Sequence, residues 1–306
     1  MERRMSLRLL VWPLALVLLA VAAAVYLTWP ERIDAAQLPA HEADLANGER
    51  LFWAGGCASC HAAPGAKGED KLLLAGGLEL KTPFGSFTVP NLSSDPQAGI
   101  GGWSDADFVT AMVKGTSPDG RHYYPSFPYA SYRHMRLEDL IDLKAFLDTL
   151  PPSDARNGDH DLAFPYSIRA GLGAWKLLYL GQPAPPVPDS DDPLVARGAY
   201  LVTGAGHCAE CHTPRDAFGG LDSARWLAGG PDPEGGDGAI PNITPSQAGI
   251  GGWSAADIAY YLESGFTPDF DSVGGSMASV QENWAKVPDE DRRAVAAYLK
   301  AIAPLP

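Results

Sequence analysis

The pattern of apolar and polar residues along the chain predicts one long apolar helix followed by amphipathic helices. Leu9–Trp29 holds 21 residues without a formal charge, close to the ~20 that an α-helix needs to cross a bilayer. Apolar residues recur at helical spacing in 137–150 and again in 292–302, so each of these segments is expected to bury one helix face. A long alternating pattern typical of β-strands does not occur. The chain is therefore predicted to be mostly α.

The sequence repeats itself at a spacing of 150 residues. Gln97–Ser104 and Gln247–Ser254 both read QAGIGGWS. The spacing has the size of a small domain, so a whole folding unit is expected to be duplicated. In both copies the final Ser is followed three residues later by an Asp, Asp107 or Asp257. This pattern predicts that the Ser caps a helix N-terminus and that the octet is scaffold.

Both copies contain the motif Cys-x-x-Cys-His. Cys57–His61 reads CASCH and Cys208–His212 reads CAECH. Two thiols three residues apart, with a His directly after, lie on one face of a helical turn, which is the arrangement of c-type haem attachment. A zinc site would require the two motifs to converge, and neither zinc nor a thiol redox pair explains the His after both motifs. We predict two haem c groups, attached to Cys57, Cys60, Cys208 and Cys211, with His61 and His212 as iron ligands.

Two further features recur at matching positions. A Pro-Asn pair follows each motif His 29 residues later, and each octet contains a Trp. These repeated residues are expected to line the haem pockets: Pro90, Asn91, Trp103, Pro241, Asn242 and Trp253.

The second axial ligand of each iron is expected to be a Met, since Met opposite His is typical of electron-carrying cytochromes c. The second unit contains one Met, Met277, in a Gly-rich loop before its closing helix. In the first unit we favour Met135, with His122 and then His134 as alternatives and an open iron last. Met112 is interpreted as a packing residue because its counterpart 150 residues later is Leu262.

The N-terminus predicts export and membrane attachment. Arg3, Arg4 and Arg8 precede the apolar run, which places the N-terminus in the cytoplasm. We interpret the run as an uncleaved transmembrane anchor in preference to a cleaved signal, with the haem domains in the periplasm at the bacterial inner membrane. The expected divisions are an anchor or signal at 1–30, a tether at 31–41, haem units at 42–155 and 191–306, and between them an extended, Pro-rich connector at 156–190.

The chain is acidic, with a formal net charge of −14. This charge argues against a nucleic-acid partner and favours a redox partner protein with a basic patch.

Several segments outside the haem motifs resemble the cytochrome c subunits of bacterial membrane-bound alcohol and sugar dehydrogenases. They include Thr82–Gly85, Tyr124–Tyr129, which reads YPSFPY, and Arg197–Leu201. The resemblance implies tandem class I cytochrome c domains that pass electrons from a periplasmic dehydrogenase towards quinone or an oxidase. Two departures stand out: those subunits usually carry three haem motifs, and they often have Met where this chain has Phe127.

Two functions from different classes follow. The first is a non-catalytic electron carrier, free-standing on its anchor or a cytochrome subunit of a dehydrogenase or respiratory complex. The alternative is a haem enzyme with an open iron site, such as a diheme peroxidase or a thiosulfate-oxidising cytochrome. We expect the carrier, because Met277 and Met135 would close both irons.

Overall fold

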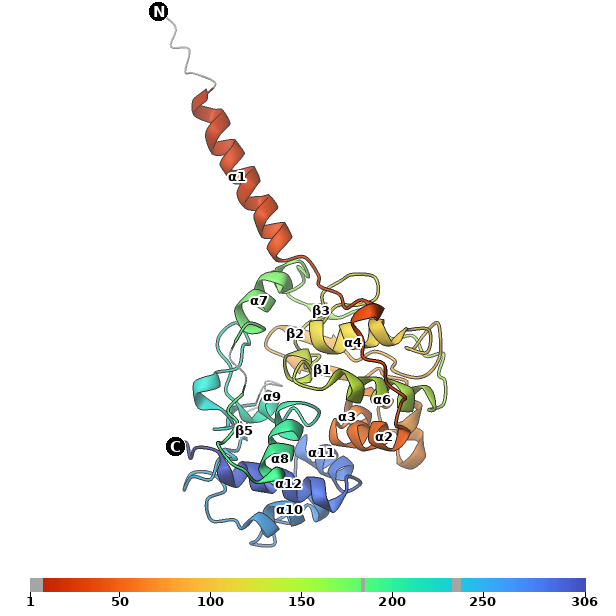
Figure 1. Cartoon of the computed structure of the whole chain (residues 1–306), viewed down its shortest axis with the longest axis vertical. Coiled ribbons are helices and arrows are strands. Elements are labelled where there is room, and N and C mark those ends of the chain that lie inside the picture. The colour runs from red at the N-terminus through yellow and green to blue at the C-terminus, as the bar shows by residue number, and fades with distance from the viewer. Residues whose placement is uncertain (1–7, 183–184, 233–237) are drawn as a thin grey trace, which may run out of the picture.

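The computed structural model describes residues 8–182, 185–232 and 238–306. Helix α1, Arg8–Leu27, stands away from a body built of short helices, long loops and a few short strands (Figure 1). Arg3 and Arg4 of the predicted anchor, and residues 183–184 of the predicted connector, lie outside the described residues.

The first half of the body is a set of helices with one small antiparallel sheet. Strand β1 pairs with β2, and β3, which comes later in the chain, adds to the other edge of β2. The helices are α2 (Leu45–Ala54), α3 (Cys57–His61), α4 (Asp105–Lys114), α5 (Tyr129–Tyr132) and α6 (Leu137–Asp148), and the strands are β1 (Glu79–Thr82), β2 (Gly85–Thr88) and β3 (Asp161–Leu162).

The second half repeats the helix order of the first. Its helices are α8 (Pro193–Thr203), α9 (Ala209–His212), α10 (Ala255–Ser264), α11 (Met277–Trp284) and α12 (Asp289–Ala301), and β4 (Gly230–Pro231) pairs antiparallel with β5 (Ala239–Ile240). Short 3₁₀ turns lie at Ala35–Gln37, Gly68–Leu73 and Ser223–Arg225. The buried apolar side chains of both halves form one continuous cluster.

In each half the first helix crosses the last helix at a glycine. A Cβ on Gly48 of α2 would lie 2.1 Å from the carbonyl oxygen of Asp142 in α6. A Cβ on Gly198 of α8 would lie 1.9 Å from the carbonyl oxygen of Ala294 in α12. Both distances are far inside van der Waals contact, so only glycine allows the helix backbones to approach this closely.

The repeated octet caps a helix in both halves, as the sequence predicts. The Ser104 hydroxyl accepts a hydrogen bond from the Asp107 backbone N–H, and the Asp107 carboxylate accepts one from the Ser104 backbone N–H. Ser254 and Asp257 form the same reciprocal pair at the start of α10. The octet is therefore structural, because it satisfies backbone donors that a helix start leaves unpaired.

The segment between the halves is not extended throughout. It contains helix α7, Gly171–Tyr179, which contacts residues of both halves. The Lys176 ammonium donates to the carbonyl oxygens of Lys114 and Gly115 at the end of α4, each at 2.7 Å. These carbonyls have no partner within their own helix, so the Lys acts as a C-terminal cap.

Among the described residues, no helix meets the combined demands of length and hydropathy for crossing a bilayer. The structure therefore does not support the predicted transmembrane anchor.

Candidate haem-binding sites

Each cysteine motif forms a single helical turn at the end of a tight bend. Gly56, with φ of 59°, precedes α3, and Cys208 caps α9. The four cysteines are not joined in disulfides. Burial raises the pKa of the Cys57 thiol to about 12, and it raises that of Cys208 to about 12 as well. A thiol with so high a pKa is almost fully protonated at neutral pH, which makes it a poor nucleophile for thiol–disulfide exchange.

The motif histidines are held by the prolines that follow 29 residues later. Nδ1 of His61 donates to the Pro90 carbonyl oxygen at 2.9 Å. Nδ1 of His212 donates to the Pro241 carbonyl oxygen at 2.8 Å. Each bond fixes the neutral tautomer in which Nε2 carries no proton, so the lone pair of Nε2 can bind a metal. Burial lowers the pKa of both imidazoles, against the opposing effect of the hydrogen bond, so the neutral form is favoured.

The asparagines of the Pro-Asn pairs act on the backbone. The Asn91 amide donates to the Ser153 carbonyl at 2.7 Å, and the Asn242 amide donates to the Leu305 carbonyl at 2.8 Å. Both acceptors lie just after the closing helix of their half. The pairs therefore tie the histidine-holding loop to the end of each unit. The shared spacing in the two copies is the sequence signal for this role, but the sequence does not reveal which atom of the pair is used.

The octet tryptophans are half-buried and pack against the apolar core. Trp103 and Trp253 both contact the core cluster. The Trp253 ring also meets Tyr261 edge-on, with centroids 5.4 Å apart. These contacts are ordinary packing in each half.

Met277 and Phe127 hold the same place in the two halves. Each follows a turn in which a backbone N–H bonds back to a helix-ending glycine: Tyr123 to Gly115, and Val273 to Gly265. Met277 begins α11 and is half-buried against the core cluster. Where the second half presents a thioether, the first half presents an aromatic ring.

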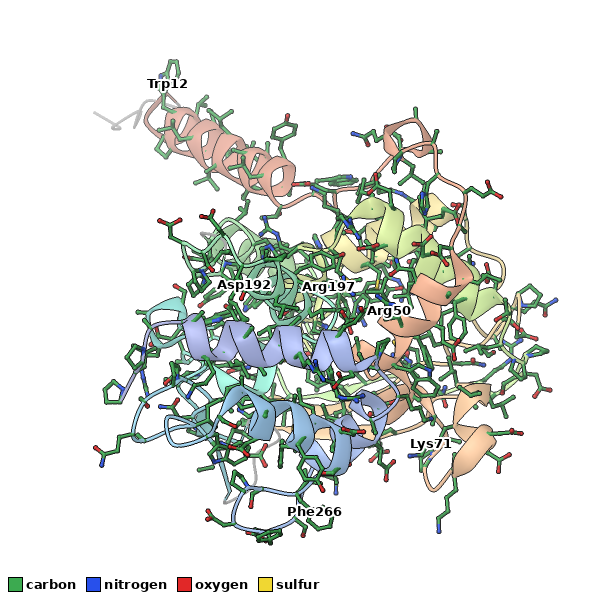
Figure 2. All side chains as sticks on the ribbon, turned by 60° about the horizontal axis from the view of Figure 1, so that its bottom comes forward. Trp12, Arg50, Lys71, Asp192, Arg197 and Phe266 are labelled. Atoms are coloured by element: carbon green, nitrogen blue, oxygen red, sulfur yellow. The ribbon has the colours of Figure 1, made fainter. Side chains whose placement is uncertain are left out.

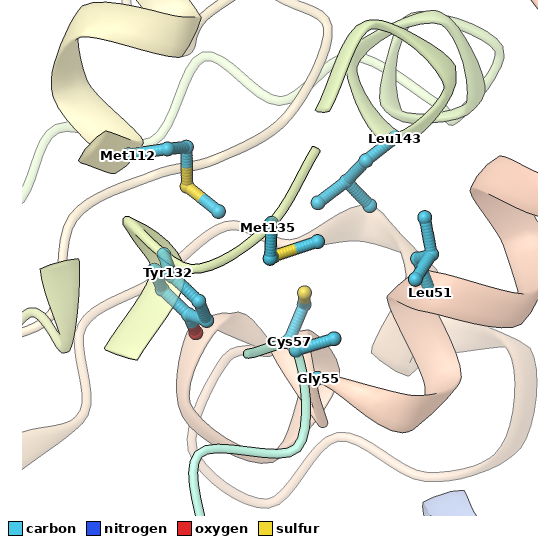
Figure 3. A pocket seen from close by; sticks show the side chains of 8 residues that line it. Leu51, Gly55, Cys57, Met112, Tyr132, Met135 and Leu143 are labelled. Carbon is cyan, nitrogen blue, oxygen red and sulfur yellow. The ribbon is translucent and has the colours of Figure 1, made fainter. Parts of the chain in front are cut away.

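Met135 lies in the buried interior beside Cys57. Its side chain, 5% exposed, lines a small cavity of about 10 Å³ that also touches Cys57, Met112 and Tyr132. Figure 3 shows the Met135 thioether between Met112 and the Cys57 thiol. Its position corresponds to the buried Val287, since both residues precede the closing helix by two positions. The cavity is at the lower limit for one water molecule, so it is a seam between helices.

The two alternative histidines lie elsewhere in the first half. His122 is buried, and its Nε2 donates to the Thr28 carbonyl at 3.0 Å, where the N-terminal segment meets α7. Its Nδ1 has no hydrogen-bond partner. His134 is half-buried at the end of α5. The structure therefore ties His122 to the N-terminal segment.

The donor set in each half fits a covalently attached haem. Each has a thiol pair on one turn and an imidazole whose Nε2 is available because Nδ1 is committed to a proline carbonyl. This is the chemistry of thioether attachment and axial histidine ligation.

Comparison with known proteins agrees with this donor set. A family model described as cytochrome c matches residues 45–151. A diheme cytochrome c-type protein of Cereibacter sphaeroides is 58% identical over 289 residues, covering 94% of this chain and 96% of that protein.

Subunits of dehydrogenases are also similar. The cytochrome c subunit of a quinone-dependent alcohol dehydrogenase of Gluconobacter oxydans is 38% identical, over 87% of this chain and 56% of the subunit. The cytochrome subunit of a fructose dehydrogenase of Gluconobacter japonicus is 35% identical, over 86% of this chain and 53% of the subunit. This chain thus spans little more than half the length of either subunit. On these grounds the chain belongs to the diheme cytochromes c, and it transfers electrons through two c-type haems.

Proposed function

We propose that the chain is a periplasmic electron carrier that serves a dehydrogenase. The haems are attached through Cys57 with Cys60 and through Cys208 with Cys211. One observation carries the proposal: in both halves the motif histidine gives Nδ1 to a proline carbonyl and keeps Nε2 available. A haem bound there supplies one-electron chemistry at its iron.

The protein's own contribution is to hold and tune that group. The proline carbonyls orient the imidazoles and increase their basicity, which strengthens them as ligands. The buried helices around each motif exclude water, and a less polar surrounding shifts the reduction potential. The residues thus fix the ligand geometry and the local dielectric, while the chain itself catalyses no reaction of a substrate.

Met277 and Met135 are proposed as the second ligands. Met277 is supported by its place as the first residue of α11, the short helix that precedes the closing helix α12. Met135 is supported by its position beside Cys57. Met135 is buried in the core, and Phe127 stands where Met277 stands in the second half. The second ligand of the first haem is therefore proposed to come from a different position than that of the second haem.

The proposed partner is a dehydrogenase with a basic docking surface. The related proteins named as alcohol and fructose dehydrogenase subunits support this class of partner. The net charge of −14 supports a basic surface on it. Complementary charge chiefly speeds the encounter, so the electron-transfer rate between the two proteins should fall as salt is added.

We further propose that α1 attaches the haem units to the inner membrane. Its apolar side chains are exposed along the helix; Trp12 is 71% exposed and Tyr26 is 81% exposed. Such an apolar surface is rarely left to water in a finished assembly. A full-length protein that stays with membranes after a carbonate wash, and a chain starting at Glu31 that does not, would support this attachment. Release of both forms would contradict it.

Two measurements test the proposed function: the number of electrons that the holoprotein takes up, and its turnover of peroxide and thiosulfate. The purified holoprotein should take up two electrons per chain reversibly, and it should pass them to an oxidised acceptor protein. It should show no turnover of peroxide or thiosulfate.

The alternative of a haem enzyme has one observation in its favour, the ring of Phe127 in the place of Met277. An open iron would bind cyanide in the resting protein. Tight cyanide binding together with turnover of peroxide or thiosulfate would contradict the electron-carrier function and support the haem enzyme.

A further inference from the structure

The two halves meet through reciprocal contacts, in which equivalent residues of the two halves exchange places. Ser59 and Glu210 hold the third position of their cysteine motifs, and Ser131 and Asn283 each precede a closing helix by six residues. The Asn283 amide donates to the Ser59 hydroxyl at 2.7 Å, and the Ser131 hydroxyl donates to the Glu210 carboxylate at 2.7 Å. Each motif therefore touches the same element of the opposite half, as in an isologous dimer.

A second reciprocal pair lies between the first and last helices. Asp139 and Asp291 are each the third residue of a closing helix and are almost fully buried. Tyr200 of α8 donates to Asp139 across the boundary, while Arg50 of α2 lies 3.8 Å from the Asp291 carboxylate. Arg197 of α8 also binds Asp291, at 2.8 Å, and Figure 2 shows it and Arg50 beside the long blue helix α12. The contacts again exchange equivalent positions.

One residue at this boundary breaks the symmetry. His207 directly precedes Cys208, and its Nε2 donates to the carbonyl oxygen of Gly55, two residues before Cys57, at 3.2 Å. Its ring meets the Tyr132 ring edge-on, with centroids 5.6 Å apart. This is a favourable aromatic geometry. The His207 side chain thus joins the two haem-attachment motifs directly.

The backbone conformation of His207 is unfavourable for a residue that carries a side chain. Its φ is 38°, in the left-handed region, where residues with a Cβ are disfavoured. The corresponding residue of the first half is Gly56, with φ of 59°. The equivalence is secure because Ser59 N–H bonds to the Gly56 carbonyl as Glu210 N–H bonds to the His207 carbonyl. Since glycine forms the same turn in the first half, the motif does not require a side chain here.

We propose that His207 is a positioning residue that locks the two haem-attachment motifs to each other, so that the haems keep a fixed separation and angle for exchanging an electron within the chain. The exchange oxidises one iron and reduces the other by one electron, with no proton or further reactant. This inference rests on the proposed attachment of a haem in each half.

The variant His207→Gly tests the proposal. Glycine relieves the left-handed strain, which offsets the lost hydrogen bond and ring contact, so the variant should retain both haems and should unfold near the wild-type temperature. The exciton couplet that two fixed haems give in the Soret circular dichroism should weaken. After flash reduction, equilibration of the electron between the haems should become several times slower.

A matched control is Phe270→Gly. Phe270 has φ of 63° in the same half and is 90% exposed. Replacing it also removes an aromatic ring from a left-handed position, but away from the boundary. The control should leave both the couplet and the equilibration rate unchanged.

A rescue variant keeps the proposal falsifiable if His207→Gly folds poorly. Asn tolerates the left-handed conformation and can donate to the Gly55 carbonyl. His207→Asn should therefore give a couplet and a rate between those of wild type and His207→Gly. A wild-type couplet and equilibration rate in His207→Gly would overturn the proposal. If His207→Gly does not fold, a wild-type couplet and rate in a folded His207→Asn would overturn it. A wild-type protein with fewer than two haems would instead overturn the proposed function.

Discussion

At the scale of single residues, the two haem sites differ most at the position that Met277 takes in the second half and Phe127 takes in the first. Met277 and Phe127 follow the same turn in their respective halves. A thioether ligand raises the reduction potential of a His-ligated haem, whereas a phenyl ring cannot bind iron. The first half therefore has to supply its second ligand from another position, proposed above as Met135, and the two haems are expected to differ in reduction potential because their ligand surroundings differ.

The variant Met277→Leu should remove a thioether ligand without changing side-chain volume much. We expect the oxidised protein to lose the part of its near-infrared Met-to-iron band that belongs to the second haem, and the potential of that haem to fall. Absorption spectroscopy and a redox titration measure both effects. Met112→Leu is the control, since Met112 is a buried packing residue of α4. An unchanged band in Met277→Leu would show that another group binds this iron.

Asp139 is a residue whose charge favours folding. Its carboxylate accepts hydrogen bonds from Arg136, Tyr200 and Asn47. Burial by itself would raise the pKa of Asp139, but these bonds outweigh it and hold the pKa below the ordinary 3.8. A depressed pKa stabilises the folded state above the unfolded-state value, and this contribution is lost as the pH falls through the folded-state value.

The variant Asp139→Asn should lower the free energy of unfolding at pH 7 by about 1–3 kcal/mol, because buried donors lose a charged partner. The difference from wild type should begin to shrink as the pH falls below the unfolded-state pKa of about 4, and it should disappear only below the lower folded-state pKa, where the carboxyl of the folded wild type is protonated as well. Urea unfolding at several pH values measures this, with the exposed Asp159→Asn as control. A difference that stays constant from pH 7 to 3 would contradict the assignment.

At the scale of elements, each half is organised by the crossing of its first and last helices. Gly198 lets α8 approach the backbone of α12, as Gly48 does for α2 and α6. Each cysteine motif follows directly after the first helix of its half, so the crossing fixes the point from which the motif starts.

Gly198→Ala should destabilise the protein by about 1–3 kcal/mol, since the new methyl group forces the helices apart. Thermal unfolding of the holoprotein measures the loss. Gly252→Ala is the control, because a Cβ there meets no atom within 4 Å. If Gly198→Ala and Gly252→Ala were equally stable, the close approach of α8 and α12 at Gly198 would be contradicted.

Elements with a local signal could be predicted from the sequence, and those without one could not. The capped starts of α4 and α10 follow from a Ser with an Asp three residues on, and the closing helices follow from their apolar stripes. Helix α7 is not predicted, because it lies in the connector, whose prolines favour an extended chain. Strands β2 and β3 pair through residues 85–86 and 161–162. These residues are so far apart in the sequence that no local pattern predicts the pairing.

The same limit applies to the haem sites. Spacing alone identified the thiol pairs, the histidines and the repeated Pro-Asn pairs. The roles of the Pro90 carbonyl and the Asn91 amide depend on three-dimensional contacts. His207 could not be recognised either, because its partners, Gly55 and Tyr132, belong to the other half of the chain.

At the scale of the whole molecule, the duplicated halves share one apolar core and a reciprocal set of polar contacts. A core shared in this way resists relative motion of the halves. The two motifs are therefore expected to stay together while the chain meets its redox partner, so that an electron entering at one site can leave from the other.

The central claim is that each half holds one haem through thioether bonds. Mass spectrometry of the denatured, intact protein matured in a bacterial periplasm tests it most directly. We expect the mass of the polypeptide plus two haems, and one haem fewer when Cys208 and Cys211 are both replaced by Ala. A polypeptide mass without haem, or pigment released from the wild type by acidified acetone, would contradict the account.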